Sequence, residues 1–88
     1  MMAEKLTIGR IGSIALNQLQ ELVGCPAEGV TGVRKDGDGW IVTIEVLEVG
    51  RVPETTDVMA SYDVHVDSDG DVLGYQRLRR YLRAQVED

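Results

Sequence analysis

The sequence contains no phenylalanine, and its aromatic residues are one tryptophan and three tyrosines among 88 residues. Hydrophobic residues still make up 43% of the chain, so we expect residues 1–88 to fold as a single domain with an aliphatic core. A chain of this length buries only about 60–65% of the surface that it exposes when unfolded, which predicts modest stability. The single cysteine, Cys25, excludes an intramolecular disulfide and fits a reducing compartment.

Signals for secretion, membrane insertion and catalysis are also missing. No basic start leads into an apolar run with a cleavage site, and no apolar run approaches the roughly 20 residues of a membrane helix. We therefore expect a soluble, cytoplasmic protein. The lone His65 has no patterned link to Cys25, so no set of nucleophile, base and orienting group can be assembled, and we assign no catalytic residues. The chain has no glycine-rich phosphate loop and no cysteine or histidine pair for zinc, so we expect no cofactor.

One acidic run, Asp67-Ser68-Asp69-Gly70-Asp71, shares some features with a calcium-binding loop. An EF-hand loop requires glycine at its sixth position and glutamate at its twelfth, whereas this run has glycine at the fourth and Leu78 at the twelfth. Aspartates that bond to nearby backbone and a glycine that accepts positive φ are also typical of a turn. We therefore predict a turn here and no metal site.

Charge is segregated along the chain, whose net charge is −6. Ten acidic side chains and a single basic one, Arg51, lie between Asp36 and Asp71. Four arginines and no acidic residue follow between Tyr75 and Arg83. An acidic body repels phosphate, so nucleic acid is not the expected partner.

Residues Glu4 to Val23 have apolar side chains at spacings of three and four, which predicts an amphipathic helix. Two glycines weaken its first turns, so Ser13 is a candidate N-terminal cap. Gly24 and Pro26 predict the helix end, because glycine accepts a left-handed cap and proline cannot continue the helix.

The middle of the chain predicts three antiparallel strands. A short strand over Gly29 to Lys35 and a long one over Trp40 to Val49 flank an Asp-Gly turn. From Val58 onward apolar and polar residues alternate until Asp67, as a strand with one buried face requires. We take this last strand to be the central one.

The segment Tyr75 to Val86 predicts a second helix, with Leu78 and Leu82 on its apolar stripe. The predicted fold is therefore α+β: an N-terminal helix, a three-stranded antiparallel meander and a C-terminal helix, a layout similar to PepSY-type domains.

Two groups of residues are candidates for binding a partner. The first is apolar and lies on the sheet face predicted to point away from the N-terminal helix: Ile41, Leu47 and Met59. Either the C-terminal helix or a partner protein is expected to cover them. The second is the arginine cluster Arg77, Arg79, Arg80 and Arg83. It has three readings: pairing with the acidic sheet, binding an acidic partner surface, or contacting nucleic acid.

Several motifs together resemble the gas vesicle protein O family. They are Gly39-Trp40, Glu45-Val46-Leu47-Glu48, Arg51-Val52-Pro53-Glu54-Thr55-Thr56-Asp57-Val58, Ala60-Ser61-Tyr62, Asp67-Ser68-Asp69-Gly70 and Tyr75-Gln76-Arg77-Leu78-Arg79-Arg80-Tyr81-Leu82-Arg83. The resemblance covers Gly39 to Arg83, about half of the chain.

The resemblance implies a non-enzymatic accessory protein for the assembly of gas vesicles, the gas-filled protein shells that give some microbes buoyancy. It also implies a cytoplasmic location, with association with gas vesicles as a further expectation. The implied partners are other gas vesicle proteins; a homodimer is an alternative, and no membrane is expected. The residues carried over are Trp40, Glu45, Glu48, Arg51, Pro53, Asp57, Tyr62, Tyr75, Arg77, Arg80, Tyr81 and Arg83.

Within that set, Glu45, Glu48, Arg51 and Asp57 join the arginines as candidates, either for an internal ion-pair network or for a binding surface. Two other functions stay open: regulation of gas vesicle gene expression, and a PepSY-like domain that binds a small ligand or inhibits.

Overall fold

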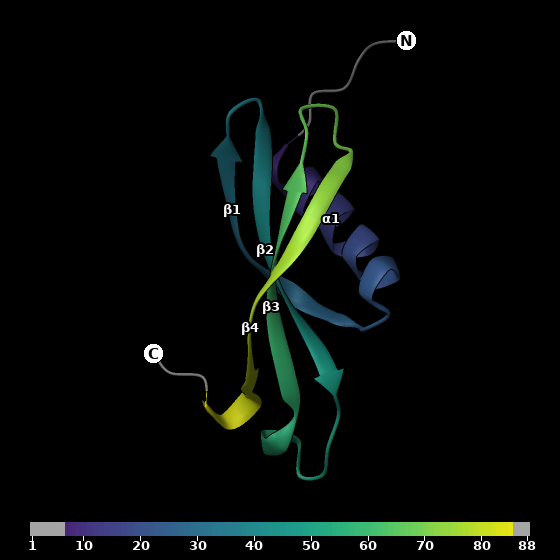
Figure 1. The fold of residues 1–88 in the computed structure, drawn as a ribbon, viewed down its shortest axis with the longest axis vertical. Helices are drawn as coiled ribbons and strands as arrows, with labels where there is room; N and C mark the ends of the chain where they lie inside the picture. Colours follow the sequence, from purple (N-terminus) through teal and green to yellow (C-terminus); the bar gives the residue numbers. More distant parts are fainter. Residues whose placement is uncertain (1–6, 86–88) are drawn as a thin grey trace.

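A computed structural model describes residues 7–85. The chain forms one α-helix and four β-strands, joined or followed by two short 3-10 helices (Figure 1). The elements in chain order are α1 (Ile8–Val23), β1 (Ala27–Asp36), β2 (Gly39–Val49), η1 (Glu54–Thr56), β3 (Val58–Val66), β4 (Val72–Leu82) and η2 (Arg83–Gln85). The four strands pair antiparallel in the order β1-β2-β3-β4, so the sheet is a meander and β1 and β4 are its edges.

The predicted N-terminal helix is confirmed over the described residues, but its first turn differs from the prediction. The cap is Thr7, whose side chain accepts a hydrogen bond from the backbone N–H of Arg10, and Ser13 lies inside the helix. The two glycines of the first turns are therefore accommodated in the helix. Gly24 adopts the left-handed conformation and ends the helix as predicted.

The predicted hairpin turns are confirmed. A two-residue turn with Gly37 at φ +61° joins β1 to β2, and Asp36 pairs with Gly39. Between β3 and β4, one carboxylate oxygen of Asp67 accepts hydrogen bonds from the backbone N–H groups of Asp69 and Asp71. The acidic run therefore folds as a turn.

The predicted C-terminal helix is wrong, and with it the three-stranded, PepSY-like layout. Residues 75–82 belong to β4, which pairs with β3 along its whole length. Leu78 is an extra residue in β4: Arg77 faces Tyr62 and Arg79 faces Ser61, so Leu78 has no cross-strand partner. This bulge breaks the alternation of a regular strand. The apolar residues Tyr75, Leu78 and Leu82 are therefore three and four positions apart, which is also the spacing of an apolar stripe on a helix. Val86, the last residue of that prediction, lies outside the described residues.

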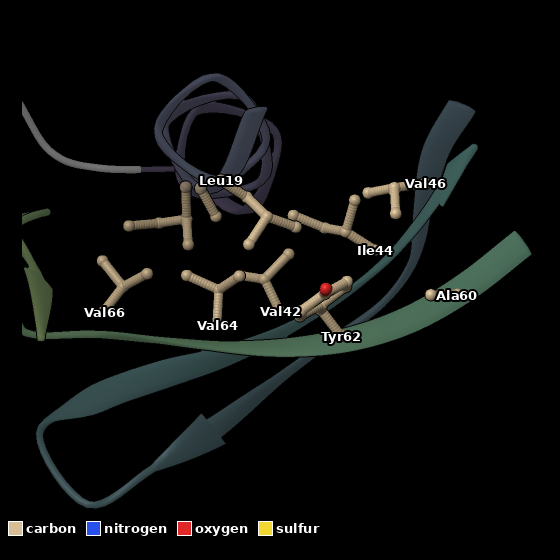
Figure 2. Close-up of a cluster of buried hydrophobic side chains, with 10 residues drawn as sticks. Leu19, Val42, Ile44, Val46, Ala60, Tyr62, Val64 and Val66 are labelled. Carbon is tan, nitrogen blue, oxygen red and sulfur yellow. The ribbon is translucent and has the colours of Figure 1, made fainter. Parts of the chain in front are cut away.

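The core lies between α1 and one face of the sheet. Figure 2 shows α1 end-on above the sheet, with Leu19 pointing down from the helix onto side chains of β2 and β3. Its fully buried members include Ile11, Ala15 and Leu19 of α1 and Val42, Ile44, Val46, Ala60 and Val64 of the sheet. The strand predicted to be central, β3, lies between β2 and β4, and its apolar positions face this core as predicted.

Within residues 7–85, no helix is both long and apolar enough to cross a membrane.

Candidate interaction surface

The face of the sheet opposite α1, here called the outer face, carries the alternate residues of β2 and β3. Ile41, Leu47 and Met59 lie on it as predicted, because their strand neighbours point into the core. Met59 sits opposite Leu47 and is almost fully buried, whereas Ile41 and Leu47 are partly exposed. The C-terminal segment, one of the two covers expected for this face, is a strand of the sheet itself.

A carboxylate lies at the centre of the outer face. Glu45 accepts hydrogen bonds from the hydroxyl groups of Ser61 (2.6 Å) and Tyr81 through one oxygen and from Thr31 (3.1 Å) through the other. Burial raises the pKa of the Tyr81 hydroxyl, and its hydrogen bond to Glu45 raises it further. Four strands therefore hold one carboxylate in a fixed position, since these residues come from β1, β2, β3 and β4.

A second polar group continues the row along the outer face. Asp63 accepts a hydrogen bond of 2.6 Å from Thr43 and forms an ion pair of 3.1 Å with Arg34 of β1. Asp63 is buried, with 9% of its surface exposed. These three residues were not among the candidates, although the strand pattern placed Thr43 and Asp63 on one face.

Glu48 organises a separate cluster on the side of the sheet that carries α1. Its carboxylate pairs with Arg77 at 3.1 Å and with Arg80 at 2.8 Å, and it accepts a hydrogen bond of 3.4 Å from Tyr62. The Glu48 side chain is 13% exposed, whereas those of Arg77 and Arg80 are 47% and 53% exposed. The two half-exposed guanidinium groups carry two positive charges and Glu48 carries one negative charge, so the cluster keeps one net positive charge.

A third cluster ties the end of β4 to β1 and to the loop before β3. Arg83 forms ion pairs with Asp57 (3.0 Å) and Glu28 (2.9 Å), and its backbone N–H donates to the backbone carbonyl of Asp57. The hydrogen bond from Arg83 lowers the pKa of Glu28. The pKa of Asp57 is lowered first by the backbone N–H of Arg51 at 2.7 Å and then by Arg83. These contacts in turn raise the pKa of Arg83.

Arg51 and Arg79 differ from the other arginines. Arg51 takes part through its backbone, and its residue is exposed. Arg79 lies on the outer face, where its guanidinium stacks 4.5 Å from the ring centre of Tyr81.

A shallow depression of about 220 Å³ opens between Glu45 with its hydroxyl partners and the Arg83 cluster. Met59 supplies apolar surface, and Glu45, Tyr81 and Arg83 supply hydrogen-bonding groups. The arrangement offers an apolar floor with charged groups of both signs at its border.

Comparison with known proteins places this chain in a family. The sequence model of the gas vesicle synthesis protein GvpO matches residues 2–87. The chain belongs to the GvpO family.

Three proteins named gas vesicle protein O or O1 are similar to this chain. Gas vesicle protein O of Streptomyces sp. (strain CB03234) is 46% identical over 73 residues, which cover 83% of this chain and 57% of that protein. Gas vesicle protein O1 of Halobacterium salinarum is 31% identical over 86 residues, covering 98% of this chain and 72% of that protein. Gas vesicle protein O of Haloferax mediterranei is 34% identical over 70 residues, covering 78% and 50%. This chain therefore spans between half and three quarters of the length of these relatives. No solved structure is significantly similar to it.

The candidate residues that were chosen partly on the GvpO resemblance do not form one site. The structure divides them among the outer face (Ile41, Glu45, Leu47, Met59, Arg79), the Glu48 cluster (Glu48, Arg77, Arg80) and the Arg83 cluster (Arg51, Asp57, Arg83). Three of the four arginines therefore form ion pairs within the molecule. Their side chains are partly exposed, so they can also contact a partner. Glu28 was missed because it lies 55 residues from Arg83 in sequence.

Proposed function

We propose that this chain takes part in gas vesicle synthesis as a non-enzymatic accessory protein that binds other gas vesicle proteins. Membership of the GvpO family supports the role in gas vesicle synthesis. One structural observation carries the mode of action: α1 covers one face of the sheet, and no element within residues 7–85 covers the outer face, which holds apolar side chains and a row of hydrogen-bonded polar side chains. We further propose that it works in the cytoplasm, in association with forming gas vesicles.

The outer face suits a protein partner better than a small ligand. Its depression of about 220 Å³ lies below the roughly 300–1,000 Å³ of typical ligand pockets. Apolar groups surrounded by hydrogen-bonding groups are the usual composition of a protein interface. The PepSY-like ligand-binding alternative has lost its basis, because it depended on a layout that the sheet does not have.

The alternative of a gene regulator has less support than the proposed function. It depended on an arginine-rich helix lying against nucleic acid. Three of those arginines lie on an edge strand, where Arg77 and Arg80 pair with Glu48, and Arg83 follows in η2 and pairs with Asp57. The net charge of −6 also opposes binding to phosphate.

A co-purification with a matched pair of variants tests the proposal. The tagged chain is expressed with the remaining genes of a gas vesicle cluster and captured at moderate salt. The outer-face variant is Ile41→Gln with Leu47→Gln, and the control, Ile8→Gln with Leu22→Gln, changes the same residue types where they are exposed on α1. We expect the wild type and the control to retain specific gas vesicle proteins and the outer-face variant to lose them.

Two results contradict the proposal in different ways. If the wild type retains no gas vesicle protein, binding to such proteins is refuted. If the outer-face variant is folded and retains them as well as the control does, binding stands and the outer face is not the surface used. Retention of only a second copy of the chain would favour the homodimer.

A further inference from the structure

The outer edge of β4, here called the β4 edge, is an unpaired strand side with an unusual composition. β4 pairs with β3 on one side only, and residues 75–80 are all exposed. Figure 1 shows β4 running along the length of the sheet, and no described strand pairs with its free edge. Such an edge presents backbone and side chains to any neighbouring chain.

Leucines occupy both extra positions of this strand. The pairing with β3 skips Leu73 and Leu78, so each is a bulge residue without a cross-strand partner. They are 70% and 49% exposed, and Tyr75 between them is 43% exposed. A bulge protects an edge strand from aggregation whatever its side chain is, so a polar residue at either bulge would give the same protection. Two exposed leucines and an exposed tyrosine within six residues of one edge strand instead favour a surface that another molecule covers.

Positive charge alternates with these apolar residues. Arg77 and Arg80 share the single carboxylate of Glu48, and Arg79 stacks on a tyrosine ring. Arg77 and Arg80 therefore share one neutralising carboxylate on the α1 side of the sheet, and Arg79 on the outer face has no carboxylate partner among the described contacts. Each keeps donor groups available, and guanidinium groups bind carboxylates in a fixed two-pronged geometry.

The composition of the β4 edge selects among the molecules that could cover it. A second copy pairing antiparallel through β4 would bring two sets of arginines together, which is repulsive. A phosphate polymer would meet Asp67, Asp69 and Asp71 in the turn that leads into β4, and it would leave the leucines without apolar partners. A peptide with carboxylate and apolar side chains matches both features.

We propose that the β4 edge binds an acidic segment of a partner protein, with carboxylates on Arg77, Arg79 and Arg80 and apolar side chains on Leu73, Tyr75 and Leu78. This inference rests on the proposed function, because the partner is another gas vesicle protein. The two bulges interrupt the backbone ladder, so side chains rather than added strand pairing provide the recognition.

Fluorescent peptides tiled across the other gas vesicle proteins of the same organism are the probes. Binding to the whole chain is measured by fluorescence anisotropy at low and at physiological ionic strength. The β4-edge variant is Leu78→Ser with Arg79→Glu, because Leu78 has no cross-strand partner and Arg79 has no carboxylate partner among the described contacts. The control, Leu22→Ser with Lys35→Glu, makes the same kinds of change at exposed positions outside β4. Circular dichroism verifies that both variants are folded.

We expect the peptides that bind to be acidic and partly apolar, and their binding to weaken with salt. The β4-edge variant should weaken binding about tenfold or more, as for loss of a hydrogen bond between charged groups, and the control should not. Equal binding by the folded β4-edge variant overturns the inference and leaves the proposed function standing. Binding of peptides without acidic residues also overturns the inference.

Two further probes distinguish other occupants. A DNA duplex, or vesicles of phosphatidylcholine and phosphatidylserine, would identify a phosphate ligand if they bind the wild type and not the β4-edge variant, and the inference would then be wrong. If the wild type binds no peptide and also co-purifies with no gas vesicle protein, the inference and the proposed function fail together. If co-purification succeeds and no peptide binds, only the inference fails.

Discussion

Leu19 and Leu22 lie one turn apart on α1 and provide a direct test of how the helix sits on the sheet. The sequence pattern places both on the apolar stripe, but Leu19 is fully buried and Leu22 is 51% exposed. Leu19→Ala removes three carbons from the core beside β2 and β3 (Figure 2), and Leu22→Ala removes the same atoms from a position half in water. The two substitutions are chemically identical, so any difference reports on packing.

The expected cost of Leu19→Ala follows from burial. Transfer of the lost carbons accounts for about 2.4 kcal/mol at ~0.8 kcal/mol each, and the cavity left behind raises the loss in the free energy of unfolding to about 3–5 kcal/mol. A chain of 88 residues is expected to have a total of only about 4–13 kcal/mol. Leu19→Ala should therefore lower the melting temperature by more than about 10 °C. Leu22→Ala should change the free energy by less than about 0.5 kcal/mol.

Urea unfolding monitored by the fluorescence of the single tryptophan, Trp40, measures both values. Trp40 belongs to β2 and is packed at the border of the core, so its signal reports unfolding of the sheet. Equal losses for the two variants, or a larger loss for Leu22→Ala, would refute the described orientation of α1.

Two further predictions concern stability. The folded-state pKa values of Glu28 and Asp57 are both lowered, so the stability that they contribute is complete above the ordinary carboxyl range and is lost as the pH falls below about 4. Urea midpoints measured against pH should decrease in that window, and an unchanged midpoint would contradict the pairing with Arg83. Gly39→Ala should cost about 1–3 kcal/mol or more, because its Cβ would lie 2.2 Å from the carbonyl oxygen of Val66. Gly29→Ala is the control, since no atom lies within 4 Å of its Cβ, and equal melting temperatures would argue against the close approach.

Local signals in the sequence predict most of the fold. The cap at Gly24, the Asp-Gly turn at Gly37 and the alternation along β3 each depend on neighbouring residues only, and each is confirmed. The position of the helix start was wrong because Thr7 competes with Ser13 as a cap, and both residue types suit that role.

The failure at β4 has a specific physical cause. The segment from Tyr75 to Leu82 contains no β-branched residue, and its arginines and leucines favour helix. Pairing with β3 overrides that preference, and the bulge at Leu78 hides the strand period from any reading of the pattern. The side of the sheet that each arginine occupies depends on the same bulge. The pairing of Arg77 and Arg80 with Glu48 was therefore beyond the reach of sequence reasoning.

The contacts of the outer face were partly predictable. Alternation placed Glu45 and Ser61 on one face, but their direct hydrogen bond requires the register between β2 and β3, which depends on the length and shape of the loop between them. The hydroxyl of Tyr81 reaches Glu45 only because residue 81 lies on a strand. Long-range contacts of this kind can be predicted only when the order and register of all the strands are known.

Gas vesicle production in a strain that lacks the gene tests the central claim, that this chain supports gas vesicle synthesis through its open protein-binding surface. The strain is supplied in turn with the wild type, with the outer-face variant Ile41→Gln/Leu47→Gln and with the control Ile8→Gln/Leu22→Gln, and vesicles are counted by electron microscopy. The account predicts normal vesicles with the wild type and the control, and few or none with an outer-face variant that is folded and present at the same level. Normal vesicles in the empty strain, or with the folded outer-face variant, would contradict it.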